Sequence, residues 1–447
     1  MATPLALLLA LSAAAQPLPQ IKFSKTDDAT ASAPAPSPDS PEDCLAKLGL
    51  AQPPAIDGQA LPAGNFDGKV AGRAMPSAFM AWEPAGDPGG DTTSAARTAR
   101  KAASLPDHDL IWMGAGSWGL SWGKGPQGLA TSFTGTPLPA GADTLRLAEI
   151  RWFDGMYVDG DATKQFLPKD HPFWQLPMTR ADSTLTSPMF MLNYHDACVQ
   201  EQVARQCKAA IAAGLDGCML DRWSDIDQDA AVGILSKIRG AIGSSGVVIV
   251  NSNGHNPQSP NRGGQVLAAS APYINGVFAE GFGEPWFFSR KGATAMQVPL
   301  PPADDWRYLV DDLKALEAAP FQSPRVDAME GWGDAGNEQY VRALTAAVMT
   351  YSSAYVLYSR PNQFIPNHDH AHDFDAFWQR KLGTASAAAR ELGGGAAQRE
   401  YSGGTVVFNG SGASIQVSFP ETRTSRATGQ SGTLFSVPAL DGDLFFK

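Results

Sequence analysis

The sequence predicts an α/β fold, a (β/α)8 TIM barrel followed by a small C-terminal antiparallel β domain. First, short apolar segments alternate with amphipathic, helix-like segments from residue 77 to residue 392. Eight apolar segments separated by helices favour a closed parallel barrel over an open sheet. Second, several of these segments stop at a carboxylate or an amide, as barrel strands with a functional rim do. Third, short alternating strands with Gly and Asn turns follow residue 393, which is typical of antiparallel sheet.

Length and composition divide the chain into four parts. The chain has 447 residues, enough for one barrel with further segments. Residues 1–16 hold a short apolar run and then Ala13-Ala14-Ala15, which resembles a signal peptide and predicts a secreted or luminal protein. Residues 17–76 are rich in Ala, Pro, Ser and Asp and are expected to form a disordered linker. The barrel is then expected over 77–392 and the β domain over 393–447.

Charge and cysteine content exclude some classes of protein. The net charge is −11 and the basic residues are scattered, which disfavours binding to nucleic acid or to an anionic membrane surface. After the leader, no segment approaches the ~20 apolar residues of a membrane span. The four cysteines permit at most two disulfides. Of these, Cys207 and Cys218 are expected to be buried free thiols, with a disulfide as the alternative.

The expected elements follow one another in a regular order. The barrel strands are expected at 77–82, 109–113, 145–152, 218–220, 246–250, a segment ending at Glu280, 325–329 and 354–358. Helices are expected at 91–103, 197–213, 230–242, 306–318, 338–350 and 374–392. The extended segment 189–194 is left unassigned. The β domain is expected to contain strands at 405–408, 414–419 and 433–437.

The stretch GLDGCMLDRW, residues 214–223, contains the first candidate catalytic residue. A helix ends before it, a buried strand follows, and the strand stops at Asp221. A later strand, in NGVFAEGF, supplies a second acid at Glu280. In β/α barrels the C-terminal ends of the strands carry the chemistry, so we expect these two acids to be catalytic. Hydrolysis of a glycosidic bond needs such a pair, a proton donor and a nucleophile or base.

Other strand ends and nearby loops provide hydrogen-bonding and aromatic side chains. Tryptophans occur in these loops at positions 82, 118, 122, 223, 286 and 332. Aromatic faces suit the C–H groups of a sugar ring, and carboxylates and amides suit its hydroxyls. The expected substrate-binding residues are Tyr194, Arg222, Trp223, Asn251, Asn253, Glu330, Trp332 and Tyr358. An oligosaccharide or polysaccharide is therefore the expected partner.

An ordered set of motifs resembles the glycoside-hydrolase-like TIM barrels, among them hypothetical glycosyl hydrolase family 15. GLDGCMLDRW and NGVFAEGF are followed by DAMEGWGD and SAYVLYSRPN, with VIVNSNG between the first two. A closing FWQRKLG and the tail REYSGGTVVFNGSG complete the set. The resemblance covers residue 77 to the C-terminus. It implies a glycoside hydrolase without a cofactor, in which Asp221 is the nucleophile or base and Glu280 is the acid/base.

Alternative interpretations remain open for the same residues. A carbohydrate-binding barrel without catalysis would share the aromatic rim, but its two acids would lie too far apart to flank one bond. His368, His370 and His372 could serve a metal-dependent hydrolase, although a polar loop is the expected structure and no metal site is predicted. Asp221 could instead be a structural acid that pairs with Arg222 or Arg180, or that caps the next helix. Asn251 and Asn253 could merely hold a turn.

Overall fold

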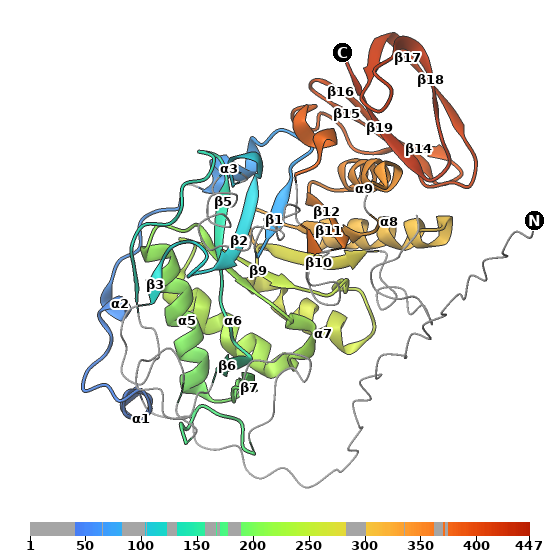
Figure 1. Cartoon of the computed structure of the whole chain (residues 1–447). Coiled ribbons are helices and arrows are strands. Elements are labelled where there is room, and N and C mark those ends of the chain that lie inside the picture. The colour runs from blue at the N-terminus through green and yellow to red at the C-terminus, as the bar shows by residue number, and fades with distance from the viewer. Residues whose placement is uncertain are drawn as a thin grey trace, which may run out of the picture. The chain divides into compact units, whose positions relative to one another are not determined.

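The computed structural model describes residues 41–64, 66–82, 103, 105–122, 132–156, 167, 170–177, 189–282, 301–334, 336–361, 370–371 and 374–447. Eight parallel strands form its central sheet (Figure 1). They run in the order β1 (Phe79–Ala81), β2 (Leu110–Gly114), β5 (Leu145–Glu149), β8 (Gly217–Leu220), β9 (Val247–Asn251), β10 (Gly276–Phe282), β11 (Ala328–Trp332) and β12 (Tyr355–Pro361).

The first and last strands of this sheet meet and close it into a barrel. Ala78 and Val356 form a parallel bridge, in which the Val356 N–H donates to the Ser77 carbonyl at 2.9 Å. Chain order and spatial order agree along all eight strands. The predicted barrel is therefore confirmed.

Side chains alternate between the barrel interior and the surrounding helices. Leu110, Leu147 and Ile249 belong to the core that includes the interior, whereas Ile111 and Val250 belong to the core beneath the helices. Inside the barrel the rings of Phe79, Trp112 and Phe278 pack together, with centroids 4.7–5.6 Å apart. This alternation follows from the two-residue period of a strand and decides which strand-end residues face the axis.

Helices follow the strands and begin at polar caps. The main ones are α5 (Ala197–Ala212), α6 (Gln228–Ile242), α7 (Arg262–Ser270), α8 (Ala303–Ala318) and α9 (Glu338–Tyr351). Four of them begin with a side-chain oxygen that accepts a backbone N–H, from Asp196, Asp227, Asn261 and Asn337. None of the helices in the described part of the chain has both the length and the apolarity needed to cross a membrane.

Two of the helices predicted from the sequence are not confirmed. The helix expected at 91–103 lies outside the described residues, apart from Ala103. The helix expected at 374–392 is wrong, because that segment contains only a 3-10 turn, η5 (Ala376–Gln379), and then begins strand β14. Gly383, at φ 84°, breaks the segment and forms a bridge with Met75, just before the first barrel strand.

Short strand pairs lie outside the barrel. β6 (Asp154–Met156) pairs with β7 (Met189–Met191), so the unassigned extended segment is not a barrel strand. The pair β3 (Ser121–Trp122) and β4 (Phe133–Thr134) follows β2 along the chain, and β13 (His370–Ala371) pairs with the end of β12. Further 3-10 turns are η1 (Leu105–Asp107), η3 (Trp223–Asp225) and η4 (Ala271–Tyr273).

The C-terminal sheet is antiparallel and packs against helix α9 (Figure 1). Its strands are β14 (Arg390–Gly393), β15 (Ala396–Tyr401), β16 (Gly404–Asn409), β17 (Ile415–Ser425), β18 (Ser431–Val437) and β19 (Asp441–Phe446). Arg342 on α9 donates two hydrogen bonds to Asp441, at 2.9 and 2.7 Å. A side chain at Gly442 would collide with Ala346, so glycine is required for this close contact. The predicted β domain is confirmed as antiparallel sheet.

Residues before the barrel form three short helices, whereas the sequence analysis predicted disordered linker as far as residue 76. They are α1 (Pro41–Lys47), α2 (Ala55–Gly58) and α3 (Phe66–Ala71). Lys69 on α3 bonds to the Thr144 carbonyl and to Asp216, both just before the start of a strand. Helix α3 therefore covers the N-terminal ends of barrel strands, away from the candidate site.

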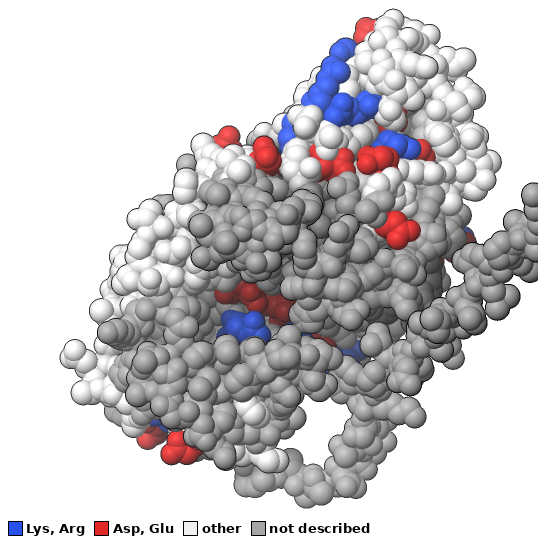
Figure 2. All heavy atoms as spheres, viewed as in Figure 1, with Lys and Arg blue, Asp and Glu red and all other residues white. Residues whose placement is uncertain are grey.

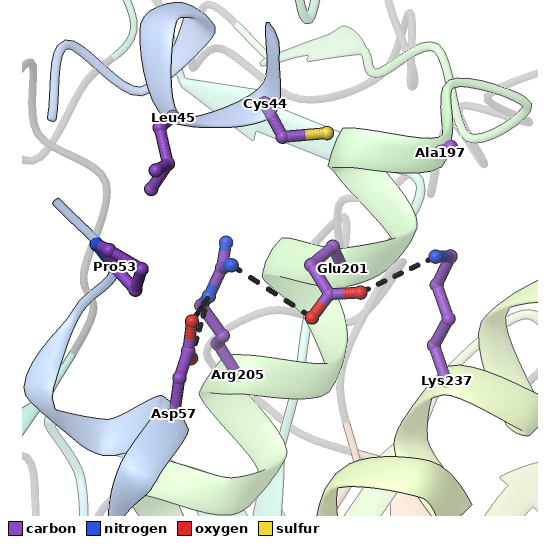
Figure 3. A pocket seen from close by; sticks show the side chains of 8 residues that line it. All are labelled: Cys44, Leu45, Pro53, Asp57, Ala197, Glu201, Arg205 and Lys237. Carbon is purple, nitrogen blue, oxygen red and sulfur yellow. Dashed lines mark hydrogen bonds and ion pairs between the residues drawn. The ribbon is translucent and has the colours of Figure 1, made fainter. Parts of the chain in front are cut away.

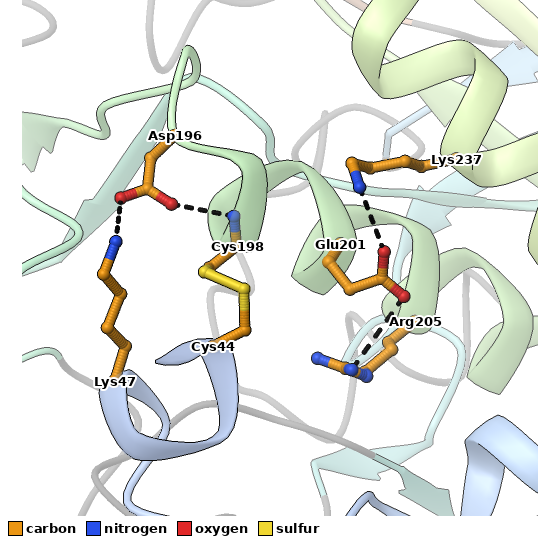
Figure 4. Close-up of a disulfide and its surroundings, with 7 residues drawn as sticks. All are labelled: Cys44, Lys47, Asp196, Cys198, Glu201, Arg205 and Lys237. Carbon is orange, nitrogen blue, oxygen red and sulfur yellow. Dashed lines mark hydrogen bonds and ion pairs between the residues drawn. A yellow bond between two sulfur atoms is a disulfide. The ribbon is translucent and has the colours of Figure 1, made fainter. Parts of the chain in front are cut away.

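The structure contains two disulfides, one of which joins Cys207 and Cys218, the two residues expected to be free thiols. Cys207 at the end of α5 is bonded to Cys218 in β8, and Cys44 on α1 is bonded to Cys198 on α5. Figure 4 shows the second bond beside the ion pair of Lys47 with Asp196, which is 2.7 Å long. Together these contacts fasten the segment before the barrel to the first turn of α5.

A pocket of about 290 Å³ lies between this segment and helices α5 and α6 (Figure 3). Its charged side chains pair with one another. Arg205 bonds to Asp57 at 2.9 Å and lies 3.9 Å from Glu201, which also pairs with Lys237 at 3.3 Å. The mutual pairing accounts for these charges as contacts that hold the segment in place.

We expect the Cys44–Cys198 disulfide to contribute more stability than the Cys207–Cys218 disulfide. The two cysteines of each pair are 154 and 11 positions apart, and a cross-link removes more unfolded-state entropy when it closes a longer loop. The Cys44→Ser/Cys198→Ser variant should lose about 5 kcal/mol in unfolding free energy, against about 3 kcal/mol for Cys207→Ser/Cys218→Ser. Denaturant unfolding measures both. Equal losses would contradict the clamping role given to the Cys44–Cys198 bond.

Candidate active site

Four polar residues continue the inward-facing positions of adjacent strands. Leu145 and Leu147 lead to Glu149 on β5, and Met219 leads to Asp221 after β8. By the same alternation, Val247 and Ile249 lead to Asn251 on β9, and Phe278 leads to Glu280 on β10. Parallel strands end at the same rim of a barrel, so the four side chains share its C-terminal mouth. They are Glu149, Asp221, Asn251 and Glu280.

The side-chain amide of Asn251 joins the two predicted acids. Its Nδ2 group donates one hydrogen bond to Asp221 Oδ1 at 2.8 Å and another to Glu280 Oε2 at 2.6 Å. The two bonded oxygens therefore lie no more than about 5.4 Å apart, which is both bonds laid end to end. The sequence placed these acids on one rim, and the structure makes them acceptors of one amide.

The orientation of this amide is set by the backbone. Asn251 is fully buried, and its Oδ1 accepts the Asn253 N–H at 2.9 Å. Only Nδ2 is then left to face the carboxylates. Asn253 is held in turn, because its own Nδ2 donates to Ser224 Oγ at 2.8 Å. Both asparagines were predicted to bind substrate, but Asn251 acts on the two acids and is shielded from solvent.

An irregularity in β10 aims Glu280 toward this amide. The pairing of β10 with β11 shifts between Ala279 and Phe282, so Glu280 and Gly281 form a bulge. Gly281 has a φ of 84°, which glycine adopts without the steric cost of a Cβ atom. Bulges are common where a side chain must be redirected near a functional site.

The backbone at three strand ends is held in an unfavourable conformation. Trp82, Arg222 and Asn253 follow or end β1, β8 and β9, with φ values of 55°, 52° and 46°. Left-handed backbone at non-glycine residues costs about 1–3 kcal/mol each and persists where the surroundings impose it. At Asp221 the indole of Trp152 contributes, since its Nε1 donates to the Asp221 carbonyl at 2.6 Å. The strain is concentrated at the rim that carries the acids.

Burial and hydrogen bonding act in opposite directions on Asp221. Burial raises the pKa of this carboxyl group above its ordinary value. The Asn251 amide, the Arg222 backbone N–H and the charges of Arg151 and Arg222 each lower the same pKa. The hydrogen bonds and the arginine charges favour the ionised form and partly offset the effect of burial, so the pKa of Asp221 stays above its ordinary value.

The sequence analysis did not identify a third acid, Glu149, or its neighbours Arg151 and Asp154. Arg151 donates two hydrogen bonds to Asp154, at 2.6 and 2.5 Å, and lies 3.8 Å from Glu149 Oε1. Burial raises the pKa of Glu149 to about 7, and the charge of Asp221 adds to that effect. The strand was predicted to run to residue 152, which hid Glu149 within it. Its true end would have shown a carboxylate at the rim.

Two predicted binding residues lie beside the acids and are partly exposed. The Tyr194 ring packs against Trp152 at 5.3 Å, and burial raises the pKa of its hydroxyl. Arg222 stacks on Phe153 at 4.9 Å and pairs with Asp225 at 3.0 Å. Figure 2 shows acidic and basic side chains close together in a hollow on one face of the molecule.

Two predicted binding residues are instead core residues. Trp223 is fully buried and donates to Ser270 Oγ at 2.9 Å. Tyr358 points outward between barrel and helix, where its ring packs on Tyr340 at 5.1 Å. Both side chains face away from the barrel mouth or lie beneath it, so contact with a substrate at these two positions has no support in their packing and stays a prediction. Each supports the rim by packing.

Glu330 and Trp332 occupy inward positions on β11 but are also buried. Glu330 accepts a hydrogen bond from Ser359 Oγ on β12, and its side chain is closed off from solvent. Trp332 is 7% exposed. They lie further around the barrel from Asp221 than Glu280 does. Contact with a substrate at these two positions stays a prediction.

The histidine cluster falls largely outside the described residues. The structure gives only the backbone of His370, in β13, and nothing for His368 or His372. Among the described residues, no group of three or more His, Cys, Asp or Glu side chains is placed to hold a metal ion. The metal-dependent hydrolase therefore stays a prediction.

Comparison with known proteins finds similarity only among solved structures. No protein-family model matches the sequence, and no curated protein sequence matches it. The glycoside hydrolase domain of PelA from Pseudomonas aeruginosa aligns at 14% identity and a TM-score of 0.38, over 67% of this chain and 100% of that one. The α-amylase from Geobacillus thermoleovorans aligns at 9% and 0.46, over 83% and 97%.

A pullulanase mutant from Paenibacillus barengoltzii, complexed with maltotriose, aligns at 10% identity and a TM-score of 0.48, over 90% of this chain and 81% of that one. All three identities are low and all three TM-scores are below 0.5, so no conclusion about this chain is drawn from these alignments. The resemblance to hypothetical glycosyl hydrolase family 15 stays a prediction.

We expect Asn251→Asp to destabilise the protein most at high pH. The introduced carboxyl group would replace a donor with a third acid against Asp221 and Glu280, which raises its pKa. Stability should then be lost as the pH rises through that pKa and regained on acidification, with a loss of about 3 kcal/mol at neutral pH. Denaturant unfolding across a pH series measures this loss.

The matched control is Asn253→Asp, because the Ser224 hydroxyl at that position can donate to a carboxylate. It should change the unfolding free energy by less than about 1 kcal/mol at any pH. Equal pH dependence in the two variants would contradict the bridging role of Asn251.

Proposed function

We propose that the protein is a retaining glycoside hydrolase with Asp221 as nucleophile and Glu280 as acid/base. The observation that carries this proposal is the Asn251 amide, which bonds to both carboxyl groups at once. Its two bonds bring one oxygen of each acid to within about 5.4 Å of the other, which supports the carboxyl spacing of retaining enzymes, about 5–5.5 Å, over the about 6.5–9.5 Å of inverting ones.

The proposed reaction has two steps. First, Asp221 attacks the anomeric carbon while the glycosidic C–O bond breaks, and Glu280 gives its proton to the departing oxygen. Second, Glu280 takes a proton from water, whose oxygen displaces Asp221 from the anomeric carbon. Each acid thereby returns to its starting state. No cofactor enters either step.

The rim residues complete the proposed site. Tyr194 and Arg222 are partly exposed near Asp221 and are the first candidates for contact with a sugar ring, together with Asn253. Glu330 and Trp332 would contact the substrate only at the floor of the mouth. An oligosaccharide or polysaccharide is the proposed substrate class.

Two further features bear on the proposal. A non-catalytic binding barrel would require acids too far apart to flank one bond, and the shared amide argues against that. The two disulfides support a secreted or luminal location, since such bonds persist in oxidising compartments.

Hydrolysis of a broad glycan panel by the purified protein, beside Asp221→Asn and Glu280→Gln, tests the proposal. Each substitution removes a group that acts in the transition state, so kcat should fall at least ~10³-fold with folding intact by circular dichroism. Glu391→Gln, an exposed acid on β14, is the matched control and should keep full activity. Variants of Asp221 and Glu280 that hydrolyse as fast as the control would rule out the assignment.

Azide separates the two roles. It should restore turnover of an activated glycoside in Asp221→Gly and give a glycosyl azide of inverted configuration, because azide replaces the nucleophile. In Glu280→Ala it should give the retained configuration, because azide then intercepts the glycosyl enzyme. Exchanged outcomes would mean that the two acids have exchanged roles.

The acidic side of the pH–activity profile should reflect Asp221. The nucleophile must be ionised, and burial raises its pKa. Activity should therefore fall as the pH drops through a midpoint above about 3.9, the ordinary pKa of aspartate. The pH dependence of kcat/KM measures this midpoint for the free enzyme. A midpoint at or below the ordinary value would contradict the effect of burial.

A further inference from the structure

A third carboxyl group, Glu149, lies next to Asp221 on the same inner face of the barrel. Glu149 ends β5 and is in register with Met219, two residues before Asp221 on the neighbouring strand. The Ile150 N–H, one residue later, donates to the Met219 carbonyl at 2.9 Å. Because side chains alternate along a strand, Glu149, Met219 and Asp221 all face inward. The mechanism proposed above uses Asp221 but leaves Glu149 without a role.

We propose that Glu149 and Asp221, which both lie near Arg151, hold one proton between them. The proton resides on Glu149, and Asp221 is ionised. The catalytic meaning of this state rests on the proposed function, since it assigns the nucleophile role to Asp221. The shared proton itself is a property of the site and does not depend on any activity. Glu149 is then a positioning residue rather than a catalytic one.

The hydrogen-bond contacts of the two carboxyl groups differ, and the difference favours the proton on Glu149. Asp221 accepts hydrogen bonds from the Asn251 amide and from the Arg222 backbone N–H, and both favour its ionised form. Among the described residues, no hydrogen-bond donor is placed on the Glu149 carboxyl group. Its nearest cation, Arg151 Nη1, is 3.8 Å away, which is an ion pair but not a hydrogen bond.

Arg151 is fixed by another partner and is shared between the two acids. Its guanidinium is engaged by Asp154, whose side chain is 2% exposed. Its charge lowers the pKa of both Glu149 and Asp221. Asp154 already balances the charge of Arg151, and Asp225 pairs with Arg222, the other cation near Asp221, so ionising both acids would leave an excess of negative charge at this end of the barrel. Keeping one proton on the pair avoids this.

The charges that face Glu149 come from two sides only in the described structure. Arg151 and Asp154 follow it along its own chain, and Asp221 lies beyond the β8 edge. On the other edge β2 ends opposite Glu149 in Gly114, which has no charge. Burial raises the pKa of Glu149 first, and Asp221 raises it further. The shift to about 7 agrees with the geometry.

NMR titration of the full-length protein tests the shared proton without needing a substrate. Glutamate carboxyl carbons are labelled with ¹³C, and Glu149 is the signal lost in Glu149→Gln. Asparagine side chains are labelled with ¹⁵N, and the Asn251 NH₂ signal reports the charge of the carboxyl groups to which it donates. In the wild-type protein Glu149 should titrate near pH 7. In Asp221→Asn its midpoint should fall by about one pH unit, because a like charge is removed.

The Asn251 signal provides the reciprocal measurement. In Glu149→Gln the Asn251 signal should lose the part of its titration that has the Glu149 midpoint near pH 7, while the exposed-acid control Glu391→Gln keeps it. Glu280→Gln identifies the part of the Asn251 titration that comes from Glu280, to which the same amide donates. Midpoints of Glu149 that are equal in wild type and Asp221→Asn, or close to that of an ordinary glutamate, would overturn the proposal. That result would leave the proposed function standing, and a missing hydrolytic activity would leave the titration valid.

Discussion

The arrangement of the barrel mouth depends on one amide that donates to two acids. Asp221 and Glu280 are both partly withdrawn from water, and two bare carboxylates at such a distance would repel each other strongly. The Asn251 Nδ2 group supplies a hydrogen bond to each. Three neighbouring features hold the groups that make these hydrogen bonds. The Asn253 N–H orients the amide, and the bulge at Gly281 directs Glu280 toward it. The Trp152 indole bonds to the backbone carbonyl of Asp221 and fixes its position. Their cost is strained backbone at the strand ends.

Sequence reasoning found the barrel and its two central acids because both depend on local pattern. An apolar strand that stops at a carboxylate places that carboxylate on the rim, whatever happens elsewhere in the chain. It failed where the result depends on the exact end or face of an element. Glu149 was hidden by a strand predicted to run three residues too far, and Tyr358 was assigned to the rim although its position on the strand faces outward.

Contacts between segments far apart in the sequence could not be predicted from the sequence pattern. The Cys44–Cys198 bond joins positions 154 apart, and no spacing rule could select it. The segment 374–392 has the composition of a helix, but Gly383 pairs with Met75 and turns it into the start of the C-terminal sheet. The sequence alone could not show that Asn251 donates to both acids, because an asparagine after a strand is equally suited to hold a turn, to bind a sugar or to bond to a carboxylate.

The stereochemistry of hydrolysis tests the central claim most directly. Once the glycan panel yields a substrate of defined anomeric configuration, ¹H NMR of the first product formed records the configuration before mutarotation. If Asn251 holds the two acids within about 5.5 Å of each other, the first product has the configuration of the substrate. A product of inverted configuration would require space for a water molecule between sugar and carboxylate. It would show that the two acids do not work at the separation that one shared amide imposes.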